Sequence, residues 1–289
     1  MARDGGDARI DARQPPAPDR STGDGRDRLE LPRATLQLPD QDYRAPVRGR
    51  DRVYHLRESE GRLLATVGAF RVVPADDVTV TASARDASSR DIRHIVEQGL
   101  VNRAHVVLNG EPTTVLVLTR EGKDLLDRHR MGGERERIQT YHAGLVKPRE
   151  LAHDAQLYRL YRVDAARIVD EGGTIRRVVL DYELKRAYQR YLNRPDRPDE
   201  EGRDEARRSF AERADLPMVD GHVQLPDLRI EYDDADGLQH HRDLELVTEH
   251  YSRTQLAAKS ASGFRLYRAS GPSRRGGTPH DPHHMERLL

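Results

Sequence analysis

The sequence predicts an α+β protein with two folded units between two disordered tails. The first observation is a run of helical patterns closed by an Asn-Gly hairpin, within residues 51–131. The second is a long amphipathic helix followed by a hairpin with acidic side chains, within residues 149–270. The third is the length, because 289 residues suffice for two domains of ordinary size.

The composition excludes several classes of protein. The chain has no cysteine, which excludes a disulfide framework, a thiolate zinc site and a cysteine nucleophile. It has no apolar run of about 18 residues that could span a membrane, and the N-terminus has no apolar signal core. We therefore expect a soluble, cytoplasmic protein with no membrane partner.

The charges balance, with 49 basic and 49 acidic residues. Nearly all the basic residues are arginine, and only four are lysine: Lys123, Lys147, Lys185 and Lys259. Arginine's planar fork suits phosphate. Arginines and acids are interspersed throughout, however, which favours the codon usage of a GC-rich genome as the explanation.

In three segments the hydrophobic residues show neither the spacing of a helix nor that of a strand. Residues 1–50 are rich in Asp, Arg, Gly and Pro and predict a disordered tail, since they cannot bury enough apolar area to offset ordering entropy. Residues 132–148 predict a linker. Residues 271–289, which include three histidines, predict a second disordered tail.

The elements of the first unit follow from caps and turns. Ser59 is a candidate N-cap for the helix in SEGRLLATVGAF, and Ser88 opens a second helix over 88–98 that Gly99 ends. The strands VNRAHVVL and PTTVLVLT are joined through Asn109-Gly110, and a further helix begins near Thr119.

This order of helices, hairpin and helix resembles a winged helix-turn-helix, and the string GLV…LTREGKDLL resembles the end of its recognition helix, the wing and the next helix. The resemblance implies that the helix near 88–98 enters the major groove of DNA. The DNA-binding residues that it implies are Arg90, Arg93 and His94 on the outer face of that helix, and Arg103 and His105 on the wing. The alternative is a solvated surface on a small domain that contacts other proteins.

The second unit begins with an amphipathic helix over 149–169, ended by Gly172-Gly173. A strand in TIRRVVLDYEL, a basic helix in KRAYQRYLNR and a charged excursion in PDRPDEEGRDEARR follow. His153-Asp154 is similar to an HD metal pair, but no second pair at suitable spacing exists, which favours an ordinary pair on the helix surface.

The hairpin after His222 has a register that its turn determines. A three-residue loop, 235–237, places Gly237 where a left-handed conformation is required. Arg229 then lies opposite Asp243, and Asp227 lies opposite Glu245.

Two facing acids are destabilising unless a positive charge lies between them. A Mg²⁺ or Mn²⁺ ion, which prefers carboxylate oxygens, would provide that charge, with Asp227 and Glu245 as its ligands. The competing account is that Arg229, or an arginine from elsewhere, neutralises the pair.

The order helix, strand, Pro-Asp strand, Glu strand and helix resembles the PD-(D/E)xK nuclease-like fold. Pro226-Asp227 matches the first motif element and Glu245 the second, while Val247 stands where the family has its lysine. Some members carry that lysine on the following helix, and Lys259 is the candidate here. The resemblance implies Asp227, Glu245 and Lys259 as catalytic residues; the alternative for Lys259 is an ordinary surface cation.

The combination of both units resembles the replication-relaxation family of plasmids and mobile elements. The matching residues are Pro226, Asp227, Glu245, Thr248, Lys259 and Tyr267. The resemblance implies DNA binding in plasmid replication or transfer, with DNA and other replication or transfer proteins as partners. Three functions stay open: a DNA-binding protein with a degenerate nuclease-like domain, a metal-dependent endonuclease, and a protein-interaction adaptor.

Overall fold

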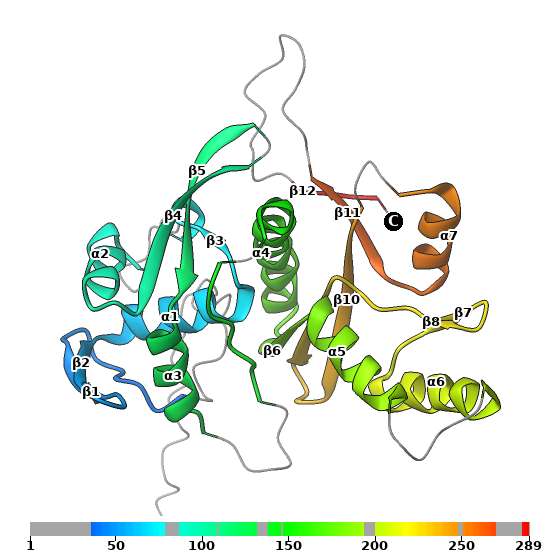
Figure 1. Ribbon diagram of the computed structural model, residues 1–289, viewed down its shortest axis with the longest axis horizontal. Coiled ribbons are helices and arrows are strands. Elements are labelled where there is room, and N and C mark those ends of the chain that lie inside the picture. The colour runs from blue at the N-terminus through cyan, green and yellow to red at the C-terminus, as the bar shows by residue number, and fades with distance from the viewer. Residues whose placement is uncertain are drawn as a thin grey trace, which may run out of the picture.

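A computed structural model describes residues 36–78, 87–108, 110–131, 138–145, 147–193, 200–247, 251–269 and 285–288. Over these ranges the chain is an α+β protein with seven α-helices and four small sheets. Figure 1 shows α4 between two groups of elements, one built from the N-terminal half and one from the C-terminal half. None of the described helices has the length and apolar character needed to cross a bilayer.

The first group contains a three-stranded antiparallel sheet of order β3-β5-β4. Helices α1, α2 and α3 pack beside it around buried leucines such as Leu64, Leu125 and Leu126. The elements are β1 (Ala45–Arg48), β2 (Val53–Leu56), α1 (Glu58–Phe70), β3 (Val73–Pro74), the 3₁₀ turn η3 (Asp76–Val78), α2 (Ser89–Glu97), β4 (Val101–Leu108), β5 (Glu111–Leu118) and α3 (Arg120–Arg128).

The sequence predicts most of the residues that cap these helices. The Ser88 side chain accepts a hydrogen bond from the Asp91 backbone at the start of α2, and Gly99 has φ of 74° just after its end. Thr119 caps α3 through the backbone N–H of Gly122. The cap predicted at Ser59 is wrong: the N-cap is Arg57, two residues earlier, and Ser59 is buried inside the helix.

The second group contains a five-stranded sheet of order β12-β11-β10-β9-β6. Neighbouring strands are antiparallel except β10 and β11, which are parallel because α7 crosses over between them. Its elements are α4 (Pro148–Asp170), β6 (Thr174–Leu180), α5 (Asp181–Leu192), α6 (Glu200–Ala214), β7 (Met218–Val219), β8 (His222–Val223), β9 (Leu228–Asp233), β10 (Gln239–Val247), α7 (Arg253–Ala261), β11 (Arg265–Ala269) and β12 (Met285–Arg287).

Both predicted tails contribute ordered elements. Residues 36–50, assigned by composition to the N-terminal tail, place Leu36, Leu38 and Val47 in the main core and form β1. Residues 285–287, assigned to the C-terminal tail, form β12 against β11. A few isolated apolar residues that pack on a distant part of the chain do not produce a regular spacing of hydrophobic residues. Composition and periodicity therefore do not reveal such segments. Residues 1–35 and 270–284 lie outside the described part of the chain.

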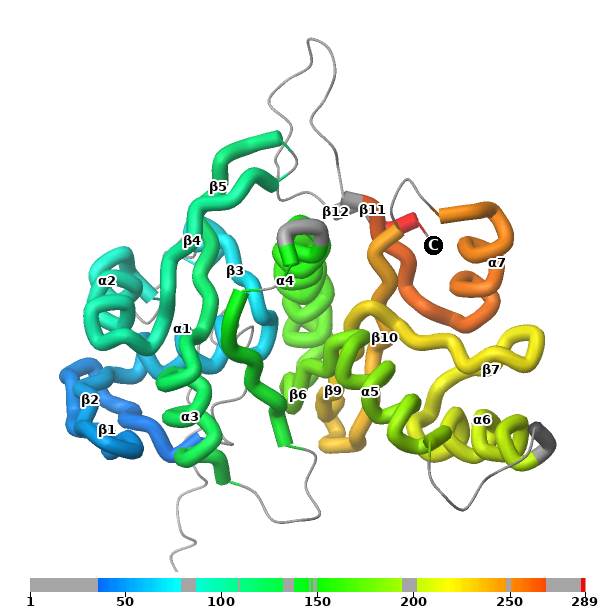
Figure 2. Tube along the Cα trace, in the orientation of Figure 1, coloured from blue at the N-terminus to red at the C-terminus, as the bar shows by residue number. Residues whose placement is uncertain are grey.

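Within the predicted linker, residues 138–142 are packed rather than solvated. Figure 2 traces its segment 138–145 in green from the end of α3 toward α4. The Gln139 side chain both donates to and accepts from the Val178 backbone on β6, at 3.0 and 2.9 Å. Tyr141 is only 2% exposed. The segment thus joins the two groups through side-chain packing as well as through the chain.

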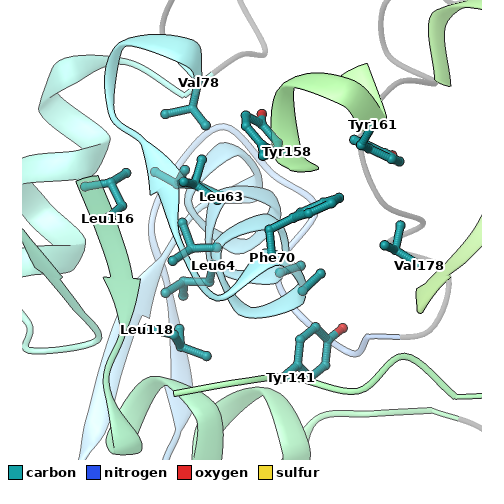
Figure 3. Close-up of a cluster of buried hydrophobic side chains, with 14 of the residues drawn as sticks. Leu63, Leu64, Phe70, Val78, Leu116, Leu118, Tyr141, Tyr158, Tyr161 and Val178 are labelled. Carbon is teal, nitrogen blue, oxygen red and sulfur yellow. The ribbon is translucent and has the colours of Figure 1, made fainter. Parts of the chain in front are cut away.

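The two groups share one hydrophobic core, which Figure 3 shows around Phe70. The Phe70 ring on α1 lies 5.1 Å from that of Tyr158 and 4.8 Å from that of Tyr161, both on α4. The buried Asp77 carboxylate accepts a hydrogen bond from Arg159, also on α4. Helix α4 is therefore a structural part of both groups.

Candidate active site

The β9–β10 hairpin has the register that its turn predicts. The Asp234 backbone N–H donates to the Leu238 carbonyl at 2.9 Å, and Gly237 adopts a positive φ of 81°. Arg229 pairs with Asp243, and the last pair is Leu228 with Leu244. The prediction of a three-residue loop is confirmed.

The two acids of the candidate site lie just beyond this last pair. The Asp227 backbone N–H donates to Glu245 Oε2 at 3.2 Å, and the Leu246 N–H donates to Asp227 Oδ2 at 2.9 Å. Each carboxylate therefore accepts from the backbone of the other strand. The predicted facing of Asp227 and Glu245 is confirmed by these contacts.

Lys259 supplies the positive charge beside the acids. Its Nζ lies 2.9 Å from Glu245 Oε1 and donates to the Leu225 carbonyl at 2.6 Å. Helix α7 is held in this orientation by Ser252, whose side chain caps its first turn. The lysine is 18% exposed at its side chain, so it is not an ordinary surface cation.

The account in which Arg229 neutralises the acid pair is wrong. Its guanidinium forms a two-point contact with Asp243, at 2.7 and 2.8 Å. Its remaining donors bind the carbonyls of Ala214 and Asp215, where α6 ends. Arg229 therefore fastens α6 to the hairpin and leaves the acid pair to Lys259.

Burial, and then the charge of Asp227, raise the pKa of the Glu245 carboxyl, while Lys259 lowers it in opposition. The Tyr251 hydroxyl, just before α7, donates to Glu245. Burial and the nearby charges of Asp227 and Glu245 raise the pKa of Tyr251, so it remains a hydrogen-bond donor at neutral pH. Lys259 and Tyr251 are thus the two partners that favour the ionised form of Glu245.

His153 lies on α4 and faces the same site. Its Nε2 lies 3.6 Å from Asp227 Oδ1, and its Nδ1 lies 3.6 Å from Asp154 Oδ1. Burial opposes protonation of this ring, but Asp154 and Asp227 outweigh it and raise the pKa of His153 to about 10. The His153-Asp154 pattern favours an ordinary pair on the helix surface, but the structure places His153 beside Asp227.

The acid pair fits a divalent ion of the magnesium type. Among the described residues no group of three or more His, Cys, Asp or Glu side chains is arranged to hold a metal. Mg²⁺ needs fewer, since it keeps several waters and binds through one or two carboxylates plus substrate phosphates. Asp227 and Glu245 provide two carboxylates that come together from adjacent parts of the sheet, which is the number that such an ion uses.

The predicted DNA-contact residues fall into two sets. Arg90 and Arg93 are exposed on α2, and Arg103 and His105 are exposed on β4. His94 differs, because its Nδ1 lies 2.8 Å from the fully buried carboxylate of Glu60. This contact helps to fix α2 on α1, so the His94 side chain is not on the outer face of the helix.

The other residues matched to the replication-relaxation pattern are placed as follows. Tyr267 on β11 is fully buried, and its hydroxyl donates to Asp164 on α4 at 2.8 Å. It holds the sheet to α4 and does not reach the acid pair. Thr248 lies outside the described residues.

Comparison with known proteins gives no further assignment. No protein-family model, curated protein or solved structure matches the chain.

Proposed function

We propose that the chain is a DNA-binding protein of the replication-relaxation type, acting in plasmid or mobile-element replication or transfer, and that its acid site cleaves phosphodiester bonds. The first group has the order expected of a winged helix-turn-helix, with α2 as recognition helix and β4–β5 as wing. The second group has the order expected of a PD-(D/E)xK-like core: α4, β6, β9, β10, α7 and β11.

The observation that carries the cleavage proposal is the contact between Lys259 and Glu245. Val247 occupies the position of the family's lysine, which favours a degenerate site. Lys259 comes to the same acid from α7, at 2.9 Å. Asp227, Glu245 and Lys259 then provide the two carboxylates and the ammonium group that the PD-(D/E)xK motif requires.

The residues have distinct roles in this proposal. Asp227 and Glu245 would hold a Mg²⁺ or Mn²⁺ ion, which when bound polarises the phosphoryl oxygen and lowers the pKa of water. Lys259 donates hydrogen bonds that orient the attacking water and stabilise negative charge developing on the phosphate. The exposed arginines of α2 hold the DNA through its phosphates and bases.

A plasmid-nicking assay with Mg²⁺ or Mn²⁺ tests the cleavage proposal. We expect the wild type to nick supercoiled DNA, Asp227→Ala and Glu245→Ala to lose nicking, and Lys259→Ala to lower the rate by about 10²-fold or more. Lys147→Ala is the matched control, because Lys147 is exposed at the N-cap of α4 and makes no ion pair with either acid among the described residues. Absence of nicking by the wild type with either metal would overturn cleavage.

A catalytically silent DNA-binding protein is the second candidate. The observation that favours it is that Glu245 already has Lys259 and the Tyr251 hydroxyl as partners. In that case a gel shift with duplex DNA persists in Asp227→Ala and Glu245→Ala and weakens in Arg90→Ala/Arg93→Ala, without any cleavage. Under both proposed functions the affinity for DNA should fall as the salt concentration rises, because protein contacts to phosphates release counterions.

A further inference from the structure

A cleft lies between the two groups of elements, on the side of α3 and α5. Its volume is about 530 Å³. The residues that line it come from the end of α1, from α3, from segment 138–145 and from α5: Arg71, Lys123, Asp127, Arg130, Thr140, Tyr141, His142, Ala143, Tyr182 and Arg186. Neither the recognition helix nor the acid pair contributes to its walls.

The cleft is strongly basic. Four of its lining residues are cationic and only Asp127 is acidic. Both Lys123 and Arg130 pair with that one carboxylate, the latter at 3.1 Å. Arg186 is exposed and forms no ion pair with any residue that the structure describes. Arg71 pairs with Glu150 and Asp154, which lie outside the lining, so Arg186 is the cation of these walls whose charge stays available for a phosphate group.

An aromatic surface lies beside this charge. The guanidinium carbon of Arg71 lies 5.0 Å from the centre of the Tyr182 ring, and the His142 ring packs edge-on against Tyr182 at 4.8 Å. The Tyr182 hydroxyl is 2.9 Å from His142 Nε2, which fixes the ring. A basic groove with an ordered aromatic side chain is the usual means of binding a single nucleic-acid strand.

The cleft adjoins the acid pair through α4 and α5. Arg71 lies 3.4 Å from Asp154, whose other oxygen faces His153, and His153 faces Asp227. On α5, Tyr182 lines the cleft, while the backbone N–H of the preceding Asp181 donates to the Asp227 carbonyl at 3.0 Å. Two side chains, Asp154 and His153, therefore stand between the cleft wall at Arg71 and the acid pair at Asp227.

The opposite end of the cleft leads toward the wing. Ala143 also lines a second pocket, of about 980 Å³, at the base of β4 and β5. That pocket includes the exposed arginines Arg52, Arg103 and Arg120, with Glu121 as its one acid. The two pockets share Ala143 in their walls, so cationic side chains line the surface on both sides of this residue.

We infer that the cleft between α3 and α5 binds the sugar-phosphate backbone of single-stranded DNA and leads that strand from the wing to the acid pair. A cleft of this volume accommodates groups of nucleotide size. A duplex is too wide to enter it and would contact only its rim. The inference rests on the proposed DNA-binding function and specifies the form of DNA that the second group of elements takes.

Fluorescence anisotropy with a labelled oligothymidylate, in full-length protein without divalent metal, tests this inference. The cleft variant is Lys123→Ala/Arg186→Ala. The matched control is Arg128→Ala/Arg190→Ala, which makes the same charge change on the exposed sides of the same two helices, outside the cleft. Circular dichroism establishes that both variants are folded.

We expect the cleft variant to bind the oligothymidylate about tenfold more weakly, and the slope of log affinity against log salt to fall by about 1.4, since each single-strand phosphate contact contributes about 0.7. The control should bind like the wild type. Equal weakening in the cleft and control variants would overturn the inference. Wild-type protein that binds duplex DNA but not the oligothymidylate would also overturn it.

Parallel measurements separate this result from the proposed function. Duplex binding that weakens in Arg90→Ala/Arg93→Ala, but not in the cleft variant, supports separate sites for duplex and single strand. If single-strand binding depends on the cleft while nicking is absent, the result supports single-strand binding in the cleft and overturns the cleavage proposal. If duplex and single strand both weaken equally in the cleft variant, the cleft is a general phosphate surface and the inference falls.

Discussion

The Glu245 carboxylate is only 1% exposed at its side chain and lies against a second carboxylate, so its charge depends on its neighbours. Burial and Asp227 raise its pKa, which means that the folded protein takes up a proton there more readily than the unfolded chain. A divalent ion competes with that proton, because it binds the ionised carboxylate. Under the proposed function, binding of a divalent ion at this residue would therefore weaken as the pH falls.

We expect Mg²⁺ or Mn²⁺ to raise the thermal midpoint of the wild type but not of Asp227→Asn or Glu245→Gln. At a metal concentration of 100 times Kd the stabilisation is about 2.7 kcal/mol. The gain should be smaller at about pH 5 than at about pH 7.5, because the raised pKa leaves more Glu245 protonated at the lower value. Differential scanning fluorimetry checks this, and an equal gain in Glu245→Gln would contradict it.

The sequence predicts the acid pair but not all of its neighbours. The facing of Asp227 and Glu245 follows from turn chemistry, because Gly237 determines the loop length and the loop length determines the register. The resemblance to the PD-(D/E)xK fold names Lys259 as the candidate lysine on the following helix, and Lys259 contacts Glu245. Tyr251 and His153, which reach the pair from the segment before α7 and from α4, are not predicted. Their positions depend on how helices pack on the sheet, which local patterns do not encode.

At the scale of elements, α3 shows how closely the helices approach the wing. Gly122, in its first turn, lies against the backbone where β4 begins. A Cβ at this position would lie 2.2 Å from the Leu100 carbonyl oxygen, and that backbone cannot move like a flexible side chain. The glycine is required by this close approach and not by helix propensity, which disfavours it by about 1 kcal/mol relative to alanine.

We expect Gly122→Ala to lower the free energy of unfolding by about 1–3 kcal/mol, because overpacking outweighs the propensity gain. Gly61→Ala in α1 is the matched control. The nearest atoms to its Cβ would all belong to the Leu38 side chain, with Cδ1 closest at 3.2 Å and no backbone atom among them. Urea denaturation of both variants tests this difference, and a Gly122→Ala protein as stable as Gly61→Ala would show that α3 can move away from β4.

The element pattern was more predictable within each group than between the groups. Helix α4, the β9–β10 hairpin and the wing follow from periodicity and turn residues. The contribution of residues 36–50, the packing of segment 138–145 and the role of β12 do not, since each is a short segment held by distant partners.

At the scale of the whole molecule, one core joins the two groups. Phe70 is 1% exposed and contacts two tyrosines of α4, which also packs on β6 and β9. Its removal leaves a cavity between the groups rather than within one of them. The two groups should therefore unfold as a single cooperative unit.

We expect Phe70→Ala to lower the free energy of unfolding by about 3–5 kcal/mol, the usual cost of removing a buried phenylalanine. Val107→Ala is the control, since Val107 on the wing is 69% exposed. Calorimetry should show one transition for the wild type and one at lower temperature for Phe70→Ala. Two separate transitions in the wild type would contradict a shared core.

Helix α4 contacts both the sheet of the first group and the acid pair. Its Leu151 and Ala155 pack against the wing's sheet, and its His153 faces Asp227 on the opposite side. Helix α4 therefore contacts both the sheet that carries β4 and the residues around Asp227. Under the proposed function, the DNA sequence bound at α2 and the bond cleaved at the acid pair would be separated by a constant number of nucleotides.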